Sequence, residues 1–460
     1  MPSKILSFFR AATVITAVLA ENGQQPLNFH QNPSEQGLLR RFEINSDSGS
    51  LKRVLNVAQE NGLDLWQVTP THVDIYSPPT GPQLPQYLRG IPHTLTNITA
   101  SRPHVAKPLS RASVAEWKLT SLQNTSFHDT YHPLFEIDAF ILELAALHPN
   151  ITHVTQLGHS GEGREMLGLT ISKQGVKGAE QLSRKKKKKK KTQDPELEVR
   201  PAFVIFGAQH AREWVATATS LYIAHSLVVD ASEPESLSSL LNVFDFHIVP
   251  VPNPDGYDYT WENDRYWYKT RQKLHSSKKC LGLDMNRNWG YKWKGNTDGD
   301  DEPNDACSYW YPGDRPFQAP EVNNIANWVM TLPNLVGFLD FRSYGQMLSS
   351  PYSYSCKRLP GDAEDQIEAG LGAARALMDV HGTSFAMGRL CTQLYRAPGN
   401  VVDWMYSRAK VKYSYVVHLR DTGTYGFSLP SRWIRPVGEE TGSMVKYLAK
   451  FIAKKMKKDM

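Results

Sequence analysis

The stretch 203–214, FVIFGAQHAREW, leads from a block of apolar residues into a histidine and a glutamate three positions apart. The apolar run predicts a buried strand over 203–208, and the pattern of 214–229 predicts a helix. Ligands of α/β proteins gather beyond the carboxyl ends of strands, so His210 and Glu213 are candidates for half of a metal site. Taken alone, the pair equally fits a hydrogen-bonded histidine and a charge at the start of a helix.

The alternation of strand and helix extends over most of the chain. A helix is predicted over 132–149, where four apolar residues fall on one face: Leu134, Ile137, Ile141 and Leu144. Further strands are predicted at 243–251, 338–341 and 413–419, and further helices at 320–331, 364–380 and 438–455. This order predicts an α/β domain with a mixed, largely parallel sheet flanked by helices.

Polar residues stand at or just beyond the ends of the other predicted strands. They are Asn253, Arg342 and His418. Because the carboxyl ends of parallel strands meet at one edge of a sheet, we expect these side chains to lie near His210.

Residues 39–76 predict a small α+β unit ahead of the larger domain. Strand-like segments LRRFEIN, LDLWQV and HVDIY surround the helix-like segment LKRVLNVAQENG. Residues 77–112 are rich in proline and serine, which predicts a linker. We therefore expect the α+β unit and its linker within 21–112, and the larger domain within 113–460.

The first twenty residues have the pattern of a cleaved signal peptide. Lys4 and Arg10 precede about ten apolar residues at 11–20, and this run is too short to span a bilayer. An apolar N-terminal helix is the alternative, although nothing amphipathic is visible there. No later run reaches about 18 apolar residues, so we expect a soluble mature protein without a transmembrane anchor.

The net charge of +6 comes from one place in the chain. Arg184 and the seven lysines at 185–191 supply eight positive charges, so the rest of the chain is slightly negative. This run predicts a solvated, Lys-rich insert near 174–199, with a tether for a polyanion as the alternative. No nucleic-acid partner is expected.

Two features agree with passage through the secretory pathway. Three glycosylation triplets are present, at Asn97, Asn124 and Asn150. The four cysteines, Cys280, Cys307, Cys356 and Cys391, are even in number and allow three disulfide pairings. Sequential pairing closes the shortest loops and is the one we expect. The cysteines show no C-x-x-C spacing, which makes a metal site built from them a poor alternative.

Other short motifs carry chemistry of their own. Asn286 and Arg287 place an amide beside a guanidinium, a pairing suited to gripping a carboxylate through charge-assisted hydrogen bonds. Asn253 begins NPDG, which also fits a plain turn. Tyr395 lies in LYRAPGNVVDW, a segment with a proline and a glycine that could move. A solvated Asn/Arg pair and a half-buried tyrosine are the alternatives.

Taken in order, seven motifs resemble the zinc carboxypeptidase A/B family over about 125–455, apart from the Lys-rich insert. The motifs are HAREW, NPDG, MNRNW, YPGDRPFQAPE, RSYGQ, LYRAPGNVVDW and HLRDTGTYGF. The resemblance implies a carboxypeptidase-like α/β fold. By position and pattern, the α+β unit resembles the propeptide domain of that family, which shields the active site.

The resemblance also implies roles for individual residues. His210 and Glu213 match two of three zinc ligands. Asn286 and Arg287 match the pair that binds the C-terminal carboxylate of the substrate, and Tyr395 matches the mobile tyrosine that closes over it. The remaining substrate-binding positions match Arg212, Arg265, Ser343, Tyr344 and Val402. An apolar residue at 402 implies preference for an apolar C-terminal side chain.

Three positions depart from the family pattern. Arg342 stands where the third zinc ligand, a histidine, is expected, and arginine offers only donors. His418 replaces the glutamate that acts as general base. Tyr268 replaces the arginine that stabilises the oxyanion. The resemblance implies a zinc cofactor. A catalytic zinc site usually has three protein ligands, and this chain retains only two of the three ligand positions.

These departures predict a pseudoenzyme. The combination is similar to the fungal inactive carboxypeptidase-like proteins linked to cell-wall organisation and to a secreted or vacuolar location. The leading hypothesis is a non-catalytic protein that recognises peptide or protein C-termini. A working zinc carboxypeptidase with an atypical site and a purely structural secretory protein are the alternatives.

Overall fold

The computed structural model describes residues 36–44, 48–100, 114–174, 199–293 and 305–459. All of the described residues belong to one compact unit, 36–460. The predicted signal peptide and nearly all of the Lys-rich insert lie outside the described residues. In the described part of the chain, no helix is both long and apolar enough to cross a membrane.

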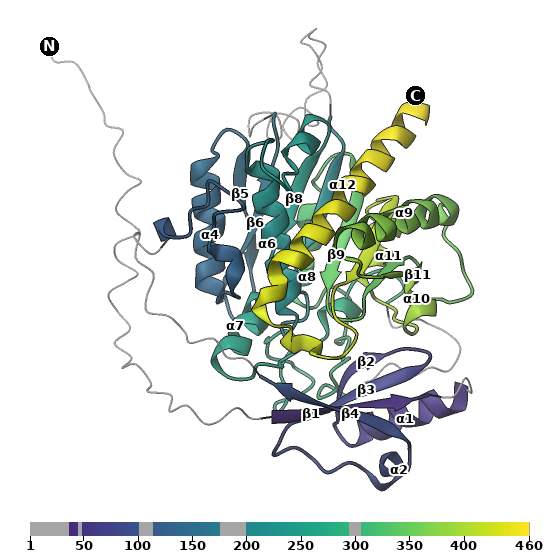
Figure 1. The fold of residues 1–460 in the computed structure, drawn as a ribbon. Coiled ribbons are helices and arrows are strands. Elements are labelled where there is room, and N and C mark those ends of the chain that lie inside the picture. The colour runs from purple at the N-terminus through teal and green to yellow at the C-terminus, as the bar shows by residue number, and fades with distance from the viewer. Residues whose placement is uncertain (1–35, 45–47, 101–113, 175–198, 294–304, 460) are drawn as a thin grey trace, which may run out of the picture. The chain divides into compact units, whose positions relative to one another are not determined.

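The first folded element is a four-stranded antiparallel sheet of order β2-β3-β1-β4 (Figure 1). Its elements are β1 (Gln36–Glu43), α1 (Ser48–Glu60), β2 (Asp64–Val68), β3 (His72–Ser77), α2 (Gln86–Arg89) and β4 (His93–Thr99). Phe42, Val73 and Ile75 face Val54 and Ala58 of α1 in one apolar cluster. The strand–helix–strand prediction for 39–76 is confirmed.

The prediction of a linker over 77–112 is wrong for its first half. Residues 86–99 hold α2 and β4, and β4 pairs with β1 along its whole length, from Gln36 opposite Thr99 to Phe42 opposite His93. The strand HTLTNIT is largely exposed, with Leu95 60% exposed. Its apolar residues therefore do not alternate as in a half-buried strand, and the pairing with β1 was not visible in the local pattern.

The second element is an eight-stranded mixed sheet of order β11-β10-β12-β9-β7-β8-β6-β5. Its four central strands are mutually parallel: β12 (Tyr413–His418), β9 (Leu335–Arg342), β7 (Ala202–Phe206) and β8 (Asp245–Val249). The outer strands are β5 (Thr152–His159), β6 (Glu165–Ile171), β10 (Met347–Ser350) and β11 (Ala386–Arg389). The mixed, largely parallel sheet predicted from the sequence is confirmed.

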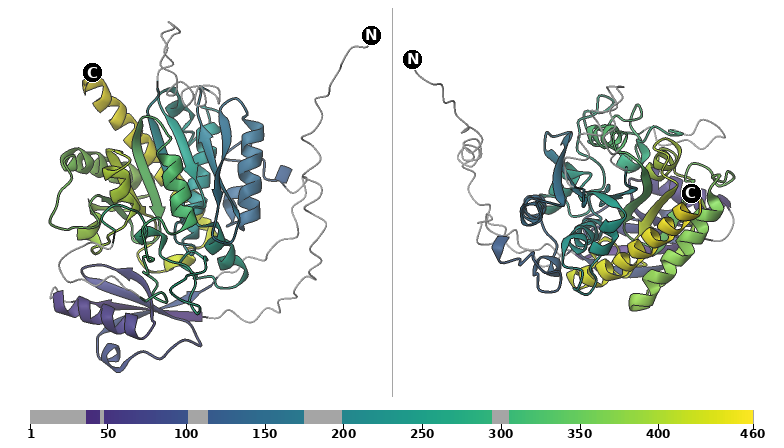
Figure 2. Two further views of the ribbon diagram at one scale, coloured as in Figure 1. Left: turned by 180° about the vertical axis from the view of Figure 1, so that it is seen from behind. Right: turned by 90° about the horizontal axis from the view of Figure 1, so that it is seen from above.

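Helices cover both faces of this sheet (Figures 1 and 2). Phe203 and Ile205 of β7 pack in a core with α4 (Leu134–Leu147), α6 (Trp214–Val228), α9 (Ala363–His381) and α12 (Ile434–Asp459). Val204 and Phe206, the alternate residues, pack in a second core with α8 (Pro320–Val329) and α11 (Val401–Ser407). Every residue of β7 is therefore buried, as expected for a central parallel strand. Two shorter helices are α7 (Pro254–Glu262) and α10 (Leu390–Gln393).

Two disulfides lie in the larger domain. They join Cys280 to Cys307 and Cys356 to Cys391. This is the sequential pairing expected from the sequence. The second disulfide joins Cys391, in α10, to Cys356, in the loop after β10.

Candidate functional site

The carboxyl ends of the parallel strands bring the predicted site residues together. Arg342 is the last residue of β9 and His418 the last of β12, and the two are paired in register on neighbouring strands. His210 follows β7 by four residues, and Glu213 immediately precedes α6. Asn253, which follows β8, serves as the N-cap of α7 instead and accepts a hydrogen bond from the backbone N–H of Gly256.

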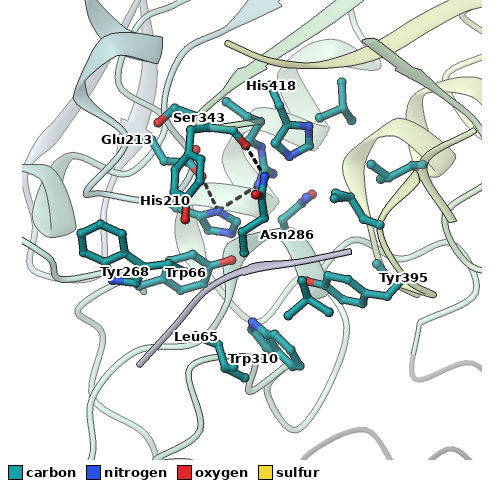
Figure 3. Close-up of a pocket in the computed structure, with 18 of the residues that line it drawn as sticks. Leu65, Trp66, His210, Glu213, Tyr268, Asn286, Trp310, Ser343, Tyr395 and His418 are labelled. Atoms are coloured by element: carbon teal, nitrogen blue, oxygen red, sulfur yellow. Dashed lines mark hydrogen bonds and ion pairs between the residues drawn. The ribbon is translucent and has the colours of Figure 1, made fainter. Parts of the chain in front are cut away.

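His210 is buried, and both of its ring nitrogens have polar neighbours. Figure 3 shows His210 beside Glu213. Its Nε2 lies 2.9 Å from Oδ1 of Asp284. Its Nδ1 lies 3.1 Å from Oε1 of Glu213 and 2.9 Å from Nη1 of Arg342. A guanidinium can only donate, so the contact with Arg342 requires the Nδ1 lone pair. In that tautomer the ring proton lies on Nε2 and is donated to Asp284, and Nδ1 makes no hydrogen bond to Glu213.

Arg342 is the resident cation of the site. Its Nε donates to Oδ2 of Asp340 at 2.8 Å, and its Nη1 donates to His210. Burial alone would lower the pKa of Arg342, but the charges of Asp340 and Glu213 raise it above its ordinary value. Asp340 is itself held by Nε2 of Gln209 at 2.8 Å. The guanidinium is therefore charged and fixed in place by two partners.

These residues do not fit a zinc ion. A metal ligand must offer a lone pair, and Arg342 presents N–H donors where the third ligand is expected. A carboxylate on one nitrogen of a histidine suits a metal ligand, but the nitrogen of His210 that Asp284 leaves free faces a donor of Arg342. Within the described ranges, no three His, Cys, Asp or Glu side chains are grouped so that they could hold a metal.

His418 is a weak base in this setting. Burial first, and then the proximity of Arg342 and His210, lower the pKa of His418 to about 3. Its Nδ1 is buried and has no hydrogen-bond partner among the described residues. With this pKa, His418 is neutral at pH 7. General bases work best with a pKa near the operating pH, so His418 is a poor proton acceptor.

Tyr268, at the oxyanion position, packs on the same histidine. The rings of Tyr268 and His210 are stacked with centroids 3.8 Å apart, and the guanidinium carbon of Arg212 lies 4.7 Å from the centroid of the Tyr268 ring. Burial raises the pKa of Tyr268 well above its ordinary value. The phenol is therefore a neutral group and supplies no positive charge for an oxyanion.

The residues expected to grip a carboxylate lie together. Nη2 of Arg287 donates to the hydroxyl of Tyr395 at 2.8 Å, and Oδ1 of Asn286 accepts from the backbone N–H of Val401 at 2.9 Å. Asp284 lies 3.8 Å from Nη1 of Arg287. Burial would raise the pKa of Asp284, but His210 and Arg287 lower it to about 2.

A cavity of about 80 Å³ lies between these groups. Ten of the predicted positions line it: His210, Glu213, Tyr268, Asn286, Arg287, Arg342, Ser343, Tyr344, Tyr395 and His418. The strand β2 of the N-terminal sheet lines it as well, through residues 65–68. Figure 3 shows Leu65 and Trp66 beside the site residues.

Polar contacts hold the N-terminal sheet over the cavity. Nη1 of Arg212 pairs with Oδ1 of Asp64 at 2.8 Å. Nε2 of Gln67 donates to the backbone oxygen of Tyr344 at 3.1 Å, and the hydroxyl of Tyr344 donates to Asp74 at 2.6 Å. The N-terminal sheet thus has the shielding position that its resemblance to a propeptide implies.

Three predicted substrate-binding residues lie outside the cavity lining. Arg212 is engaged with Asp64. Arg265 donates to the backbone oxygens of Arg212 and Phe427 and stacks on Trp214 at 3.7 Å. Val402 is fully buried in a cluster with Leu390 and Val416, and these two side chains line the cavity. The three glycosylation asparagines, Asn97, Asn124 and Asn150, are all exposed.

Sequence reasoning missed two carboxylates that organise the site, Asp284 and Asp340. Both are fully buried. Asp340 interrupts the apolar run FLDF two residues before Arg342, and a charge inside a strand of that kind requires a partner. That interruption was a usable signal. Asp284 stands two residues before Asn286 in a loop and carried no comparable signal.

The parallel sheet, the covered pocket at its carboxyl edge and the Asn/Arg pair define a carboxypeptidase-like protein. The sequence profile described as zinc carboxypeptidase matches residues 137–443, well over half of the chain. The chain belongs to the zinc carboxypeptidase family.

Curated relatives cover most of the chain. The inactive metallocarboxypeptidase ECM14 of Ajellomyces capsulatus (strain H143) is 31% identical, over 90% of this chain and 71% of the relative. A metallocarboxypeptidase A-like protein of Trichophyton verrucosum is 32% identical, over 90% of this chain and 94% of the relative.

Solved structures show the same fold. The crystal structure of thrombin-activatable fibrinolysis inhibitor is 27% identical with a TM-score of 0.71, over 91% of this chain and 99% of that chain. Carboxypeptidase A from Helicoverpa armigera is 25% identical with a TM-score of 0.72, over 93% of this chain and 100% of that chain.

Proposed function

We propose that this protein is a non-catalytic member of the zinc carboxypeptidase family that binds the C-termini of peptides or proteins. The observation that supports the absence of catalysis is the contact between Nη1 of Arg342 and Nδ1 of His210 at 2.9 Å. It places a donor of hydrogen bonds where a metal ligand is needed. The likeness to relatives named inactive metallocarboxypeptidases supports the same conclusion.

The site lacks three of the groups that hydrolysis requires. Two of the three metal-ligand positions remain, the base position holds a histidine with a pKa of about 3, and the oxyanion position holds a neutral phenol. Removing a single oxyanion donor typically costs about 10²–10³ in rate. An atypical active enzyme would have to replace all three, and no described side chain in the cavity does so.

Binding of a C-terminus is supported by what the site retains. Arg287, Asn286 and Tyr395 converge on the cavity, and Leu390 and Val416 give it an apolar wall backed by Val402. A related structure, bovine thrombin-activatable fibrinolysis inhibitor, is in complex with tick carboxypeptidase inhibitor. Because β2 lines the cavity, a peptide enters only when the N-terminal sheet moves aside, and this movement in the full chain is part of the proposal.

The location and biological setting are part of this proposal. Two disulfides and three exposed glycosylation asparagines support passage through the secretory pathway to a secreted or vacuolar site. A role in cell-wall organisation is proposed from the resemblance to the fungal inactive proteins. A purely structural role is the second candidate, favoured by the engagement of Arg287 with Tyr395 within the protein itself.

A calorimetric comparison tests the proposal. The full chain is titrated with a peptide that ends in leucine, once as the free acid and once as the C-terminal amide. We expect the amide to bind more weakly by one to two decades, since a hydrogen bond to a charged group contributes about 1.5–3 kcal/mol. Equal affinities for acid and amide, or no binding of either, would eliminate C-terminus recognition and leave the structural role.

A further inference from the structure

Several buried polar atoms around the cavity lack partners. They are Nη2 of Arg342, Oε2 of Glu213, Oγ of Ser343 and Nδ1 of His418, each without a hydrogen bond to the described residues. All four side chains line the cavity. Buried polar groups are nearly always satisfied, so such a gathering at one cavity indicates that something polar completes it.

The orientation of Arg342 singles out one of these atoms. Asp340 holds Nε and His210 holds Nη1, so the plane of the guanidinium is fixed from two sides. Nη2 is what remains, and it belongs to a residue that is only 4% exposed.

We propose that Arg342 is a built-in substitute for a metal ion, and that its Nη2 donates a hydrogen bond to the carbonyl oxygen of the last peptide bond of a bound C-terminus. This rests on the proposed function. Arg287 then holds the terminal carboxylate, and Arg342 holds the oxygen one residue further in. Oε2 of Glu213 remains as an acceptor for an N–H of the same ligand.

The charges of the site favour these separate roles of Arg287 and Arg342. The guanidinium of Arg342 is neutralised by Asp340 on the side away from the cavity, and Asp284 lies between His210 and Arg287. A fixed monocation of this kind orients a carbonyl oxygen but has no exchangeable ligand position for a water nucleophile. Binding without hydrolysis is the consequence, and it needs no metal.

The metal half of the proposal is tested by zinc content. The full chain is purified, equilibrated with zinc, dialysed and analysed, beside Arg342→His. We expect far less than one zinc ion per chain for the wild type and no change of its melting temperature with a chelator. Arg342→His should gain zinc that the chelator removes. Stoichiometric, tightly held zinc in the wild type would overturn the proposal whatever peptides do.

The ligand half is tested by a double-mutant cycle. A peptide ending in leucine is compared with its analogue in which the last amide is a thioamide, a poorer acceptor. We expect the wild type to prefer the amide by about tenfold, and Arg342→Gln to bind both alike. Arg375→Gln, at a side chain that is 70% exposed, is the control for loss of one positive charge and should behave as the wild type.

The outcomes separate the two proposals. If the free acid is preferred but the thioamide effect persists in Arg342→Gln, the contact of Arg342 is overturned and C-terminus recognition stands. If neither acid nor amide binds, both fall. Because Arg342→Gln leaves Asp340 buried without its cation, Arg342→Gln combined with Asp340→Asn repeats the cycle with both charges removed, and melting temperatures identify any unfolded variant.

Discussion

Asp64 of the N-terminal sheet and Arg212 of the larger domain form an ion pair at 2.8 Å in which Arg212 is only 1% exposed. Arg212 also donates through Nη2 to the backbone oxygen of Leu65 and lies over the ring of Phe427 at 4.4 Å. Both charges depend on the sheet staying in place. The pair therefore links the stability of the N-terminal sheet to the closure of the cavity.

Asp64→Ala should destabilise the protein by about 3–5 kcal/mol, because it leaves the buried charge of Arg212 without a partner. Denaturant unfolding measures the difference. Asp379→Ala is the matched control, since its partner Arg375 is exposed and such pairs contribute about 0–1 kcal/mol. Equal effects of the two changes would show that the buried pair does not hold the sheet.

Two substitutions should separate metal binding from catalysis. Arg342→His should restore zinc binding, yet peptide hydrolysis should stay absent because burial, the largest cause, still holds the pKa of His418 below its ordinary value and leaves it a poor base. Adding His418→Glu should produce the first measurable release of C-terminal leucine. Turnover in Arg342→His alone, measured with a chromogenic peptide and abolished by a chelator, would contradict the weak-base argument.

Arg287→Ala should weaken binding of a free-acid peptide by one to two decades, since about 1.5–3 kcal/mol of charge-assisted hydrogen bonding is lost. The amidated peptide should bind both proteins equally, because it has no carboxylate for Arg287. Calorimetry at fixed salt gives all four affinities. A loss of similar size for the amide would mean that Arg287 supports the fold rather than the ligand.

The disulfide between Cys356 and Cys391 should stabilise the protein by about 2–4 kcal/mol. Replacing both cysteines by serine should lower the free energy of unfolding by this amount. Tyr395 lies four residues after Cys391, so the same change should also weaken peptide binding. Peptide mapping under non-reducing conditions checks the pairing, and free thiols or crossed pairs in the wild type would contradict it.

Glu321 should make the protein less stable as the pH rises from about 4.5 to 7. Burial raises the pKa of this fully buried carboxyl from 4.5 to about 7, so the folded state binds its proton more tightly than the unfolded state does. At about 1.4 kcal/mol for each pKa unit, up to about 3 kcal/mol is lost across this window. Glu321→Gln should remove that part of the pH dependence of unfolding. An unchanged slope would mean that Glu321 is ionised in the fold at pH 5.

The sequence predicted the elements whose pattern is local. The strands near 203–208, 338–341 and 413–419 and the helix with Leu134, Ile137, Ile141 and Leu144 on one face were found because buried strands and helices carry apolar runs and periods. The strand β4 escaped because its stability comes from pairing with β1, more than fifty residues earlier.

The sequence predicted which residues form the site better than it predicted their hydrogen-bond and ion-pair partners. The motifs named ten of the side chains that line the cavity, yet they gave no partner for Arg342. In the structure its ion-pair partner is Asp340, two residues earlier on the same strand. Arg265, expected at the substrate, instead binds two backbone oxygens. Such partners are set by packing in three dimensions, which spacing along the chain does not report.

The register that sets Arg342 beside His418 also makes the two positions depend on one another. A glutamate at 418 would lie next to the guanidinium and compete for it with His210 and Asp340. A neutral histidine leaves the guanidinium where it is. Returning a glutamate to position 418 while arginine stays at 342 would therefore add an ion pair to the pocket and would not supply a free base.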